Sequence, residues 1–395
     1  MRVNHFRQLL ALVLAVTSTA FASTTWYVNG VTGSDSDNCM SPTTACKTIG
    51  HAISLTASGD TVEVSATTYQ ENLTIAHSLT ITGAGASTTI IDGGGVNTVI
   101  TIPNTTSHVA VSNLTIQNGS ANIGAGIFNA GTMSINSTTI SANAVHLGSS
   151  PRGGGVENGG TLTISNSTLT GNTAVGLESG AGGGIDNGGT LTISNSTLTG
   201  NTASGGDRLH SGYGYGGGIN NGGTLTISNS TLTGNTATGS GNGYGGGIKN
   251  GGTLRISNST LSGNAAPTGG GIADFLGSSA TLQNSIIANS SSGGNCSGIM
   301  TSDGYNLSSD TTCDFGGPGD LNNTNPQLGP LQNNGGPTDT MAIPLDSPAL
   351  DAGNPSGCTN NNGRLLKIDQ RGYPRPGKYK HDRRCDMGAY ESQTD

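Results

Sequence analysis

The sequence predicts an all-β protein that folds as a right-handed parallel β-helix, and three observations support this fold class. The chain is rich in glycine, with 67 Gly in 395 residues, and poor in charged and aromatic residues, at 10% and 4%. One sequence block returns almost unchanged along the middle of the chain, which is typical of a solenoid. Within each block apolar residues alternate with threonine and serine, and this two-residue period indicates strands.

Residues 1–22 have the composition of a secretion signal. Arg2, His5 and Arg7 give a polar start, Leu9–Val16 is apolar, and Ala20–Ala22 is an A-x-A cleavage site. This apolar run is too short to cross a bilayer, for which about 18 to 20 residues are needed, and no later segment approaches that length. We therefore expect a secreted protein, extracellular or on the outer cell surface, with no transmembrane helix.

Residues 23–108 are expected to form the N-terminal cap and the first, irregular coils. Ile49, Ala52 and Ile53, with Thr56, lie on one face of a short helix that would cover the first coil. Such a cap is needed because a solenoid otherwise ends in an open, unpaired sheet. The segments GDTVEV, ENLTI and SLTITGAG then indicate the strands of the first coils.

Residues 109–292 are expected to form the regular coils. Four near-identical copies start at Gly153, Gly182, Gly216 and Gly245, a looser one starts at Gly124, and a degenerate one starts at Gly269. The spacings of 29, 29, 34, 29 and 24 residues predict a solenoid. No helical stripe occurs in the block, which excludes leucine-rich and ankyrin-type repeats.

Stacking of the coils would align equivalent residues in columns. Three columns are apolar: Val156/Ile185/Ile219/Ile248, Leu162/Leu191/Leu225/Leu254 and Ile164/Ile193/Ile227/Ile256. Three are asparagine: Asn158/Asn187/Asn221/Asn250, Asn166/Asn195/Asn229/Asn258 and Asn172/Asn201/Asn235/Asn264. An asparagine amide can bond to the same amide one rung away, so we predict that all three columns form structural ladders.

The repeat period fails at about Gly293, and residues 293–395 are expected to form an irregular C-terminal cap. Six cysteines fit an oxidising compartment and lie in three sequence-local pairs. Six thiols allow 15 pairings, and we predict the local ones: Cys39–Cys46, Cys296–Cys313 and Cys358–Cys385. No metal site is expected, because no C-x-x-C occurs and no histidine lies beside a cysteine pair at ligand spacing.

The formal net charge of −8 is unevenly distributed. Residues 23–363 hold 5 basic and 18 acidic residues, which argues against a nucleic-acid partner. Eight basic residues cluster in the tail: Arg364, Lys367, Arg371, Arg375, Lys378, Lys380, Arg383 and Arg384. This segment could meet anionic polysaccharide or lipid headgroups, although we favour an ordinary charged cap surface, with Asp369 and Arg371 paired inside the cap.

The ends and the repeats resemble known families. Four N-terminal segments resemble the first coils of pectin-lyase-like β-helix proteins: YVNGVTGSDSDN, CKTIGHAI, GDTVEV and ITGAGASTTIIDGG. Two parts of the repeat, GGGI and LTGN, resemble repeats of polymorphic outer-membrane proteins. Four segments of the tail resemble the choice-of-anchor Q domain family of bacterial secreted or surface proteins: NPQLGPLQNNGGPTDT, SPALDAGN, DQRGYPRP and CDMGAYE. The resemblance implies fold and location but little chemistry, because this fold hosts lyases, hydrolases and adhesins.

One variable column could carry chemistry: Phe128, Glu157, Asp186, Asn220 and Lys249, spaced by about 4.8 Å per rung. Glu157 over Asp186 could hold a cation, and calcium is the candidate cofactor. The segment Gly33–Asn38 also resembles the start of a calcium loop, but it lacks the downstream glutamate. We interpret the column of Glu157, Asp186 and Lys249 as a variable solvent-facing position and predict no catalytic residue.

A loop in the longest repeat is the candidate binding site. Ser204–Tyr215 carries the five extra residues of that repeat and is expected to bulge from its coil. Its candidate residues are Asp207, Arg208, His210, Tyr213 and Tyr215. Tyr215 and Tyr244 both precede a Gly-Gly-Gly, so their rings should stack on neighbouring rungs and form a platform for a sugar face.

These observations favour a secreted or cell-surface β-helix protein, adhesin-like, that binds glycans or other surface polymers as a monomer and without catalysis. The first alternative is a polysaccharide lyase or glycoside hydrolase, which would need clustered carboxylates and a tuned base on one face. The second alternative is a purely structural surface component, which would need exposed, complementary ends.

Overall fold

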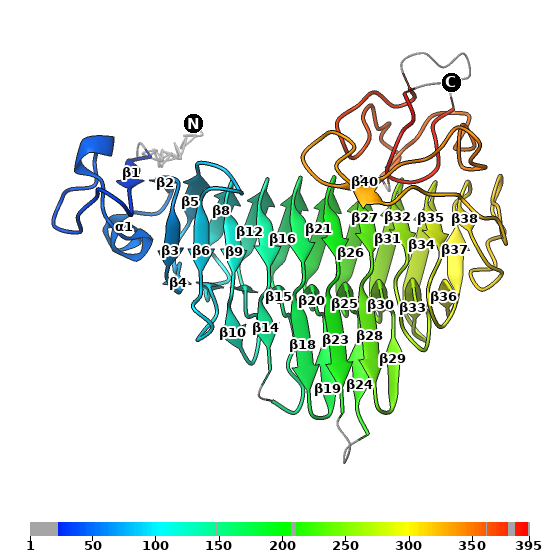
Figure 1. Ribbon diagram of the computed structural model, residues 1–395, viewed down its shortest axis with the longest axis horizontal. Helices are drawn as coiled ribbons and strands as arrows, with labels where there is room; N and C mark the ends of the chain where they lie inside the picture. The colour runs from blue at the N-terminus through cyan, green and yellow to red at the C-terminus, as the bar shows by residue number, and fades with distance from the viewer. Residues whose placement is uncertain (1–22, 147, 207–210, 361, 378–383, 394–395) are drawn as a thin grey trace, which may run out of the picture.

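The computed structural model describes residues 23–146, 148–206, 211–360, 362–377 and 384–393. It confirms the predicted fold class, because short strands stack in parallel as the rungs of a β-helix (Figure 1). The predicted secretion signal, residues 1–22, lies outside the described residues, as do Asp207, Arg208 and His210. No helix in the described part of the chain is long and apolar enough to cross a membrane.

Three parallel sheets form the body of the solenoid. The long sheet has 11 strands: β1 (Thr25–Val28), β2 (Asp60–Val64), β5 (Leu79–Gly83), β8 (His108–Ser112), β12 (Thr132–Asn136), β16 (Thr161–Ser165), β21 (Thr190–Ser194), β26 (Thr224–Ser228), β31 (Thr253–Ser257), β34 (Ser279–Gln283) and β37 (Met300–Ser302). The second sheet has 10 strands: β3 (Thr68–Gln70), β6 (Ile90–Asp92), β9 (Thr115–Gln117), β13 (Thr139–Ser141), β17 (Thr168–Thr170), β22 (Thr197–Thr199), β27 (Thr231–Thr233), β32 (Thr260–Ser262), β35 (Ile286–Ala288) and β38 (Leu307–Ser308). The third has nine: β4 (Leu73–Thr74), β7 (Ile100–Ile102), β11 (Ile127–Asn129), β15 (Val156–Asn158), β20 (Ile185–Asn187), β25 (Ile219–Asn221), β30 (Ile248–Asn250), β33 (Ile272–Asp274) and β36 (Cys296–Ser297).

Two smaller parallel sheets project from the middle of the solenoid. One has five strands: β10 (Ser120–Ala121), β14 (Ala144–Val145), β18 (Thr173–Gly176), β23 (Thr202–Gly205) and β28 (Thr236–Gly239). The other has three: β19 (Ser179–Ala181), β24 (Tyr213–Tyr215) and β29 (Asn242–Tyr244). We call the strands β18, β19, β23, β24, β28 and β29 the fin, which extends below the body in Figure 1.

Glycine allows the two sheets of the fin to pack closely together. Gly180, Gly214 and Gly243 lie in register at the centres of β19, β24 and β29. A side chain on any of them would collide with backbone carbonyl oxygens of the facing five-stranded sheet, such as those of Ala174 and Ala237. The glycine of each of these strands therefore packs inward, while the residues before and after it point to the outer face.

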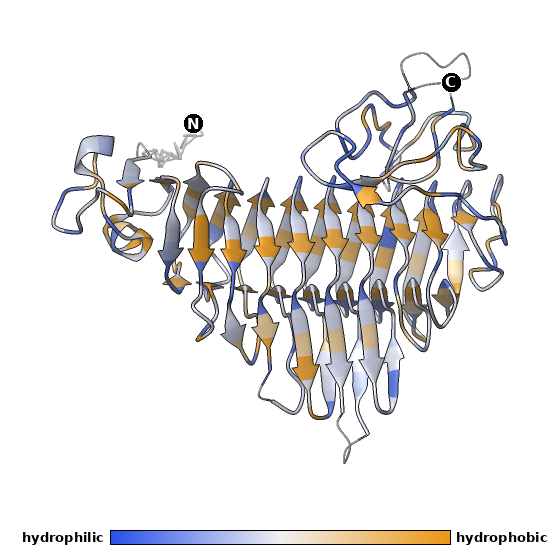
Figure 2. Cartoon of the chain, in the orientation of Figure 1, coloured by the Kyte–Doolittle hydropathy of each residue, from blue (hydrophilic) through white to orange (hydrophobic). Residues whose placement is uncertain are grey.

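The apolar columns form the core of the solenoid as predicted. Leu162, Leu191, Leu225 and Leu254 are partners in the long sheet, and their side chains are fully buried. The isoleucine columns that begin at Ile164 and Val156 are buried in the same way. In Figure 2 these positions give the hydrophobic bands that cross successive strands.

Two of the three asparagine columns form the predicted amide ladders. In the nine-stranded sheet four side-chain amides each donate to the asparagine of the next rung at 2.7 Å, and the ladder ends at Asn250: Asn129, Asn158, Asn187 and Asn221. A second ladder has bonds of 2.9–3.0 Å: Asn143, Asn172, Asn201, Asn235 and Asn264. Every rung therefore pairs its buried amides with neighbours.

The third asparagine column has a different role from the predicted one. Its members occupy the turn between the long and ten-stranded sheets with φ between 45° and 50°: Asn166, Asn195, Asn229 and Asn258. Asparagine tolerates this left-handed conformation better than most residues. No continuous ladder joins these described residues, and the amides of Asn229 and Asn258 instead donate to the carbonyl oxygens of Ile368 and Thr359.

The N-terminal end is covered as predicted. The helix α1 (Ile49–Leu55) buries Ile49, Ala52 and Ile53 and packs against β1, β2 and β4. Thr48 caps its first turn by accepting a hydrogen bond from the His51 amide, and Thr56 lies just past its end. A 3-10 helix, η1 (Pro42–Thr44), precedes it. The cap therefore extends the apolar core beyond the first rung.

The C-terminal region differs from the predicted end cap. The strands β36, β37 and β38 add a rung beyond residue 292, and Cys296, Met300, Cys313 and Phe315 close the apolar core there. The described residues of 322–360, 362–377 and 384–393 instead lie along the side of the solenoid, beside the ten-stranded sheet (Figure 1). They include a short antiparallel pair, β39 (Leu331–Gln332) and β40 (Thr340–Met341).

Side-chain hydrogen bonds attach this lateral module to several coils. The Gln370 amide donates to Thr197 Oγ1 at 2.9 Å, and Thr231 Oγ1 donates to Gln370 Oε1 at 2.7 Å. The Asn284 amide donates to the carbonyl oxygen of Asp386. The three predicted disulfides are present, and Cys358–Cys385 lies within the module.

Candidate functional site

The Gly-Gly-Gly segment of each repeat brings two columns of side chains together. Its first glycine has a positive φ, 69° at Gly153 and 64° at Gly216, which favours glycine over other residues. The chain turns there from the three-stranded sheet into the nine-stranded sheet. As a result the residue before the glycines and the residue five positions later lie side by side, as Arg152 and Glu157 show with an Nε–Oε1 distance of 2.9 Å.

The first of these columns runs through the positions before the glycines: Ile123, Arg152, Ala181, Tyr215, Tyr244 and Thr268. The second runs through the nine-stranded sheet: Phe128, Glu157, Asp186, Asn220, Lys249 and Ala273. We use the name corner site for Arg152, Glu157, Asp186, Asn220 and Lys249. We use the name tyrosine face for Tyr213, Tyr215 and Tyr244.

The carboxylates of the corner site are buried, so the expectation of a solvent-facing column is wrong for them. Glu157 and Asp186 are each only 8% exposed to solvent. Arg152 covers them: its Nε lies 2.9 Å from Glu157 Oε1 and 3.7 Å from Asp186 Oδ2, while 47% of its own side chain stays exposed. On the other side, the Asn220 amide donates a hydrogen bond to Asp186.

Burial perturbs the ionisation of this pair. Removal from water, together with the neighbouring Asp186 charge, raises the pKa of Glu157 from 4.5 to about 7. Burial also raises the pKa of Asp186. Two buried oxygens of the site, Glu157 Oε2 and Asn220 Oδ1, have no hydrogen-bond partner among the described residues. The site therefore combines carboxyl groups of raised pKa with unsatisfied polar atoms.

Lys249 connects the corner site to the tyrosine face. Its Nζ lies 5.9 Å from the centroid of the Tyr215 ring and 4.7 Å from that of Phe275. Burial lowers the pKa of Lys249, and the negative charge of Asp186 opposes this effect. Two sets of candidate residues that were predicted separately thus lie next to each other.

The tyrosine face is a row of stacked rings on the outer side of the fin. Tyr215 and Tyr244 are partners in the three-stranded sheet, as predicted, with ring centroids 5.7 Å apart and planes 11° apart. Tyr213 stacks on both at 6.0 and 6.4 Å, and it is 38% exposed. Phe275 extends the row with an edge contact to Tyr244 at 5.3 Å.

The segment predicted to bulge begins and ends in strands. Ser204 and Gly205 end β23, and Tyr213–Tyr215 form β24, while the two neighbouring coils make the same excursion through β18–β19 and β28–β29. The neighbouring coils are shorter by five residues, yet they contribute strands to the fin as well. Asp207, Arg208 and His210, between Gly206 and Ser211 in the sequence, fall outside the described residues.

Arg152 and Phe275 belong to the site but were not predicted from the sequence. Arg152 precedes a Gly-Gly-Gly in the same way as Tyr215 and Tyr244, so this shared position was the signal that could have identified it. Phe275 occurs in the degenerate repeat, where the register with Tyr244 cannot be read from the sequence block. Its contact with the tyrosine face depends on the three-dimensional stacking.

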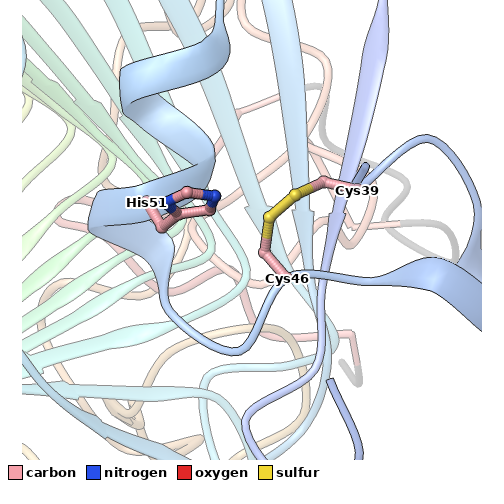
Figure 3. Close-up of side chains that lie close together, drawn as sticks. All are labelled: Cys39, Cys46 and His51. Carbon is pink, nitrogen blue, oxygen red and sulfur yellow. A yellow bond between two sulfur atoms is a disulfide. The ribbon is translucent and has the colours of Figure 1, made fainter. Parts of the chain in front are cut away.

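Two other candidate features have structural roles. Cys39, Cys46 and His51 place possible ligand atoms within 4.8 Å of one another, so a histidine does lie beside a cysteine pair (Figure 3). The two sulfur atoms form a disulfide, however, and offer no thiolate to a metal ion. The Asp35 carboxylate, in the segment compared with a calcium loop, accepts hydrogen bonds from Lys47 N and Thr48 N.

The basic segment of the tail is partly internal. Arg371 is buried and pairs with Asp369 at 2.7 Å, as predicted. Arg375 is also buried, and its Nε lies 3.4 Å from Glu391 Oε2. These two arginines therefore hold the lateral module together and cannot form part of an exposed anion-binding surface.

The comparisons with known proteins add the following. No protein-family model matches the chain, and no curated protein matches it. Among solved structures it is similar to pectate lyase Pel9A, with 16% identity over 94% of this chain and 97% of that one and a TM-score of 0.46. It is also similar to a mutant pectin methylesterase in complex with a hexasaccharide, with 12% identity over 95% and 99% and a TM-score of 0.33. A PL6 family alginate lyase, AlyGC, has 13% identity over 84% of this chain and 57% of its own, with a TM-score of 0.30.

Proposed function

We propose that this protein binds glycans, or other polymers with sugar-like faces, on the tyrosine face and does so without cleaving them. The observation that supports this best is the stack of Tyr213, Tyr215 and Tyr244 on the outer side of the fin. Aromatic rings present large, rigid apolar faces at low entropic cost, and tyrosine adds a hydroxyl group at its edge. A polymer with flat, partly apolar units can lie along such a row.

The corner site supplies polar groups beside this row. The guanidinium of Arg152 lies in the same column as Tyr215 and Tyr244, two rungs before Tyr215. The ammonium of Lys249 lies in the neighbouring column, 5.9 Å from the centroid of the Tyr215 ring. Hydrogen bonds from such groups to hydroxyls would fix the orientation of a chain that the rings hold by contact. The proposed ligand therefore runs along the solenoid axis, across the rungs of the fin.

The alternative of a polysaccharide lyase or hydrolase is supported by the perturbed carboxyl pair, since such groups cluster at catalytic sites. Burial weighs against it. Glu157 and Asp186 are each 8% exposed beneath Arg152, so a glycosidic bond of an external polymer cannot reach them in this arrangement. Binding without turnover remains the function that the arrangement supports best.

We further propose that the protein acts outside the cell, as a secreted or surface-held monomer. Three disulfides fit an oxidising environment. The tail motifs that resemble the choice-of-anchor Q domain family form the lateral module, and they support the same location. Both ends of the apolar core are closed, which favours a monomer over a filament.

The test is to incubate the mature protein with immobilised pectin, alginate and neutral polysaccharides, and to score retention and soluble product in the same samples. We expect retention on at least one polymer with no release of unsaturated or reducing sugar. Release that disappears in Glu157→Gln would replace the binding proposal with the enzymatic one. Absence of retention on every polymer would contradict the binding proposal.

A further inference from the structure

The outer face of the long sheet changes character at its first two rungs. One outward column of this sheet carries serine in the regular coils, as at Ser165 and Ser194. Followed strand by strand toward the N-terminus, the same column holds Glu63 on β2 and Tyr27 on β1. An acid and an aromatic ring thus stand where the repeat places a small hydroxyl.

Both of these side chains point away from the core. Val62 and Val64, on either side of Glu63, are buried inside the solenoid, so Glu63 projects from the opposite face of the strand. Tyr27 is the register partner of Glu63 on the neighbouring strand and lies on the same face, about 4.8 Å away along the solenoid. Thr82 continues the column on β5.

The cap loop between Cys39 and Cys46 adds a wall beside this column. Its two ends are fixed to β1, since Tyr27 N donates to the Cys39 carbonyl oxygen at 2.8 Å and Cys46 N donates to the Tyr27 carbonyl oxygen at 2.9 Å. The disulfide closes the loop. Pro42 and Ala45 of the loop line a cavity of about 380 Å³, whose floor is the outer face of β1, β2 and β5. We use the name cap pocket for this cavity, which lies at the N-terminal end of the solenoid (Figure 1).

The carboxylate of Glu63 has no partner in the protein. Among the described residues it forms no ion pair and no hydrogen bond. Two other carboxylates of the same region are engaged: Asp60 accepts a hydrogen bond from Trp26 Nε1 at 2.9 Å, and Glu71 accepts one from Ile49 N at 2.8 Å. Glu63 is therefore the carboxylate of this end that is free to bind a ligand.

The charge of the surroundings favours a cation. Residues 23–108 hold six acidic residues and one basic residue, Lys47. Glu63 is the one charged residue among the described residues that line the cap pocket. A concave site with a single sign of charge concentrates ions of the opposite sign, so the cap pocket should attract positively charged groups.

We propose that the cap pocket binds an amino sugar, that is, a sugar unit with a free ammonium group. The carboxylate of Glu63 accepts hydrogen bonds from the ammonium group, and the ring of Tyr27 packs against the sugar. Side chains at the edge of the pocket, such as Asn29 and Thr82, are within the lining and can bond hydroxyl groups. This inference does not depend on glycan binding at the tyrosine face, which lies on the fin in the middle of the solenoid.

Other ligand classes fit the cap pocket less well. A sugar acid would place a second negative charge beside Glu63. A calcium ion takes about six to eight oxygen ligands, and one carboxylate lines this cavity among the described residues. An ammonium group, by contrast, is satisfied by one carboxylate and is attracted to an aromatic face. The volume of about 380 Å³ is in the range of small-ligand sites, which is about 300 to 1,000 Å³.

The test is isothermal titration calorimetry of the whole secreted, disulfide-bonded protein with a glucosamine trisaccharide and with the same trisaccharide after N-acetylation. The two probes differ at the amino groups, because acetylation removes the positive charge. We expect the free amine to bind about tenfold more tightly or better, as is typical of a charge-assisted hydrogen bond. Equal affinity for the two probes, or no binding of the free amine, would overturn the proposal.

A matched pair of variants tests the role of Glu63. Glu63→Gln removes the charge with little change in size, and the affinity for the glucosamine trisaccharide should fall about tenfold or more. The unfolding midpoint should not move, because this side chain is exposed. Glu178→Gln changes an exposed carboxylate between β18 and β19 and should bind like the wild type. Unchanged affinity in Glu63→Gln, or equal loss in both variants, would contradict the assignment.

Two further samples separate the cap pocket from other sources of binding. The variant with Tyr213→Ala, Tyr215→Ala and Tyr244→Ala should bind the glucosamine trisaccharide like the wild type, and a loss there would place the sugar on the tyrosine face instead. A lysine tripeptide carries ammonium groups without a sugar ring and should bind more weakly than the trisaccharide. Equal binding of the tripeptide would show attraction by charge alone and would contradict the amino-sugar site.

Discussion

Two polar columns lie one residue apart on the same strands, and they differ in repetition, hydrogen bonding and ionisation. The inner column, which includes Asn158 and Asn187, repeats the same residue on each rung and pairs every amide at 2.7 Å. The outer column, with Glu157 and Asp186, changes residue at each rung, leaves buried oxygens without partners and shifts ionisation. A residue type that is repeated on every rung thus indicates a structural column. A residue type that changes from rung to rung indicates a column that is available for function.

The largest effect should come from breaking the inner column. Asn158→Ala removes a hydrogen-bond acceptor for Asn129 and leaves Asn187 Oδ1 without its donor, all inside the solenoid. Unsatisfied buried polar groups cost about 1 to 3 kcal/mol each, so we expect the free energy of unfolding to fall by about 2 to 4 kcal/mol. Urea denaturation followed by circular dichroism measures it.

The matched control changes the preceding residue. Glu157→Gln at pH 5 mimics the protonated acid in size and charge, so the free energy of unfolding should change by less than about 0.5 kcal/mol. If the two variants were equally destabilised, the distinction between the inner and outer columns would fail.

The second largest effect should be a pH dependence of the free energy of unfolding that comes from the outer column alone. The pKa of Glu157 rises from 4.5 to about 7 on folding, so the folded state holds this proton more tightly than the unfolded chain. The associated stability is complete below about pH 4.5 and is lost as the pH rises through about 7. Across that range the wild type should lose about 1 to 3 kcal/mol more than Glu157→Gln. If the free energies of unfolding of the wild type and Glu157→Gln changed equally with pH, folding would not raise the pKa of Glu157.

The smallest effect should follow a change on a face where the repeat is intact. Thr192 is an outward residue of the long sheet, in register with Thr163 and Thr226. We expect Thr192→Val to alter the free energy of unfolding by no more than about 0.5 kcal/mol, because surface substitutions away from special features have little effect. A thermal melt is sufficient, and a shift of several degrees would show that this face has a role that repetition alone did not reveal.

The fold could be predicted from the sequence where one coil copies another. The leucine column from Leu162 to Leu254 follows directly from the repeat, and so does the pairing of Tyr215 with Tyr244. The contact of Lys249 with Tyr215 could not be predicted, because it depends on the turn at the Gly-Gly-Gly and on the fin that brings the two sheets together. A pattern of residues fixes which positions align but not how two sheets meet.

The lateral module illustrates the same limit. Its disulfide and the Asp369–Arg371 pair are local and were predicted, whereas its place beside the ten-stranded sheet depends on contacts across more than a hundred residues, such as Gln370 with Thr197. Asn229 and Asn258 of the third column find their carbonyl acceptors only through this docking. Long-range docking leaves no periodic signal in a sequence.

The measurement that tests the central claim most directly is glycan retention by a triple variant of the tyrosine face. Tyr213→Ala, Tyr215→Ala and Tyr244→Ala together should weaken retention at least tenfold, as expected for the loss of stacking worth more than about 1.4 kcal/mol. The unfolding midpoint should stay close to that of the wild type, because these rings lie outside the core. The control is the triple variant Thr163→Ala, Thr192→Ala and Thr226→Ala, which changes three consecutive rungs of the repeated face and should retain glycan fully. Undiminished retention by the tyrosine variant, or equal loss in both variants, would contradict the account.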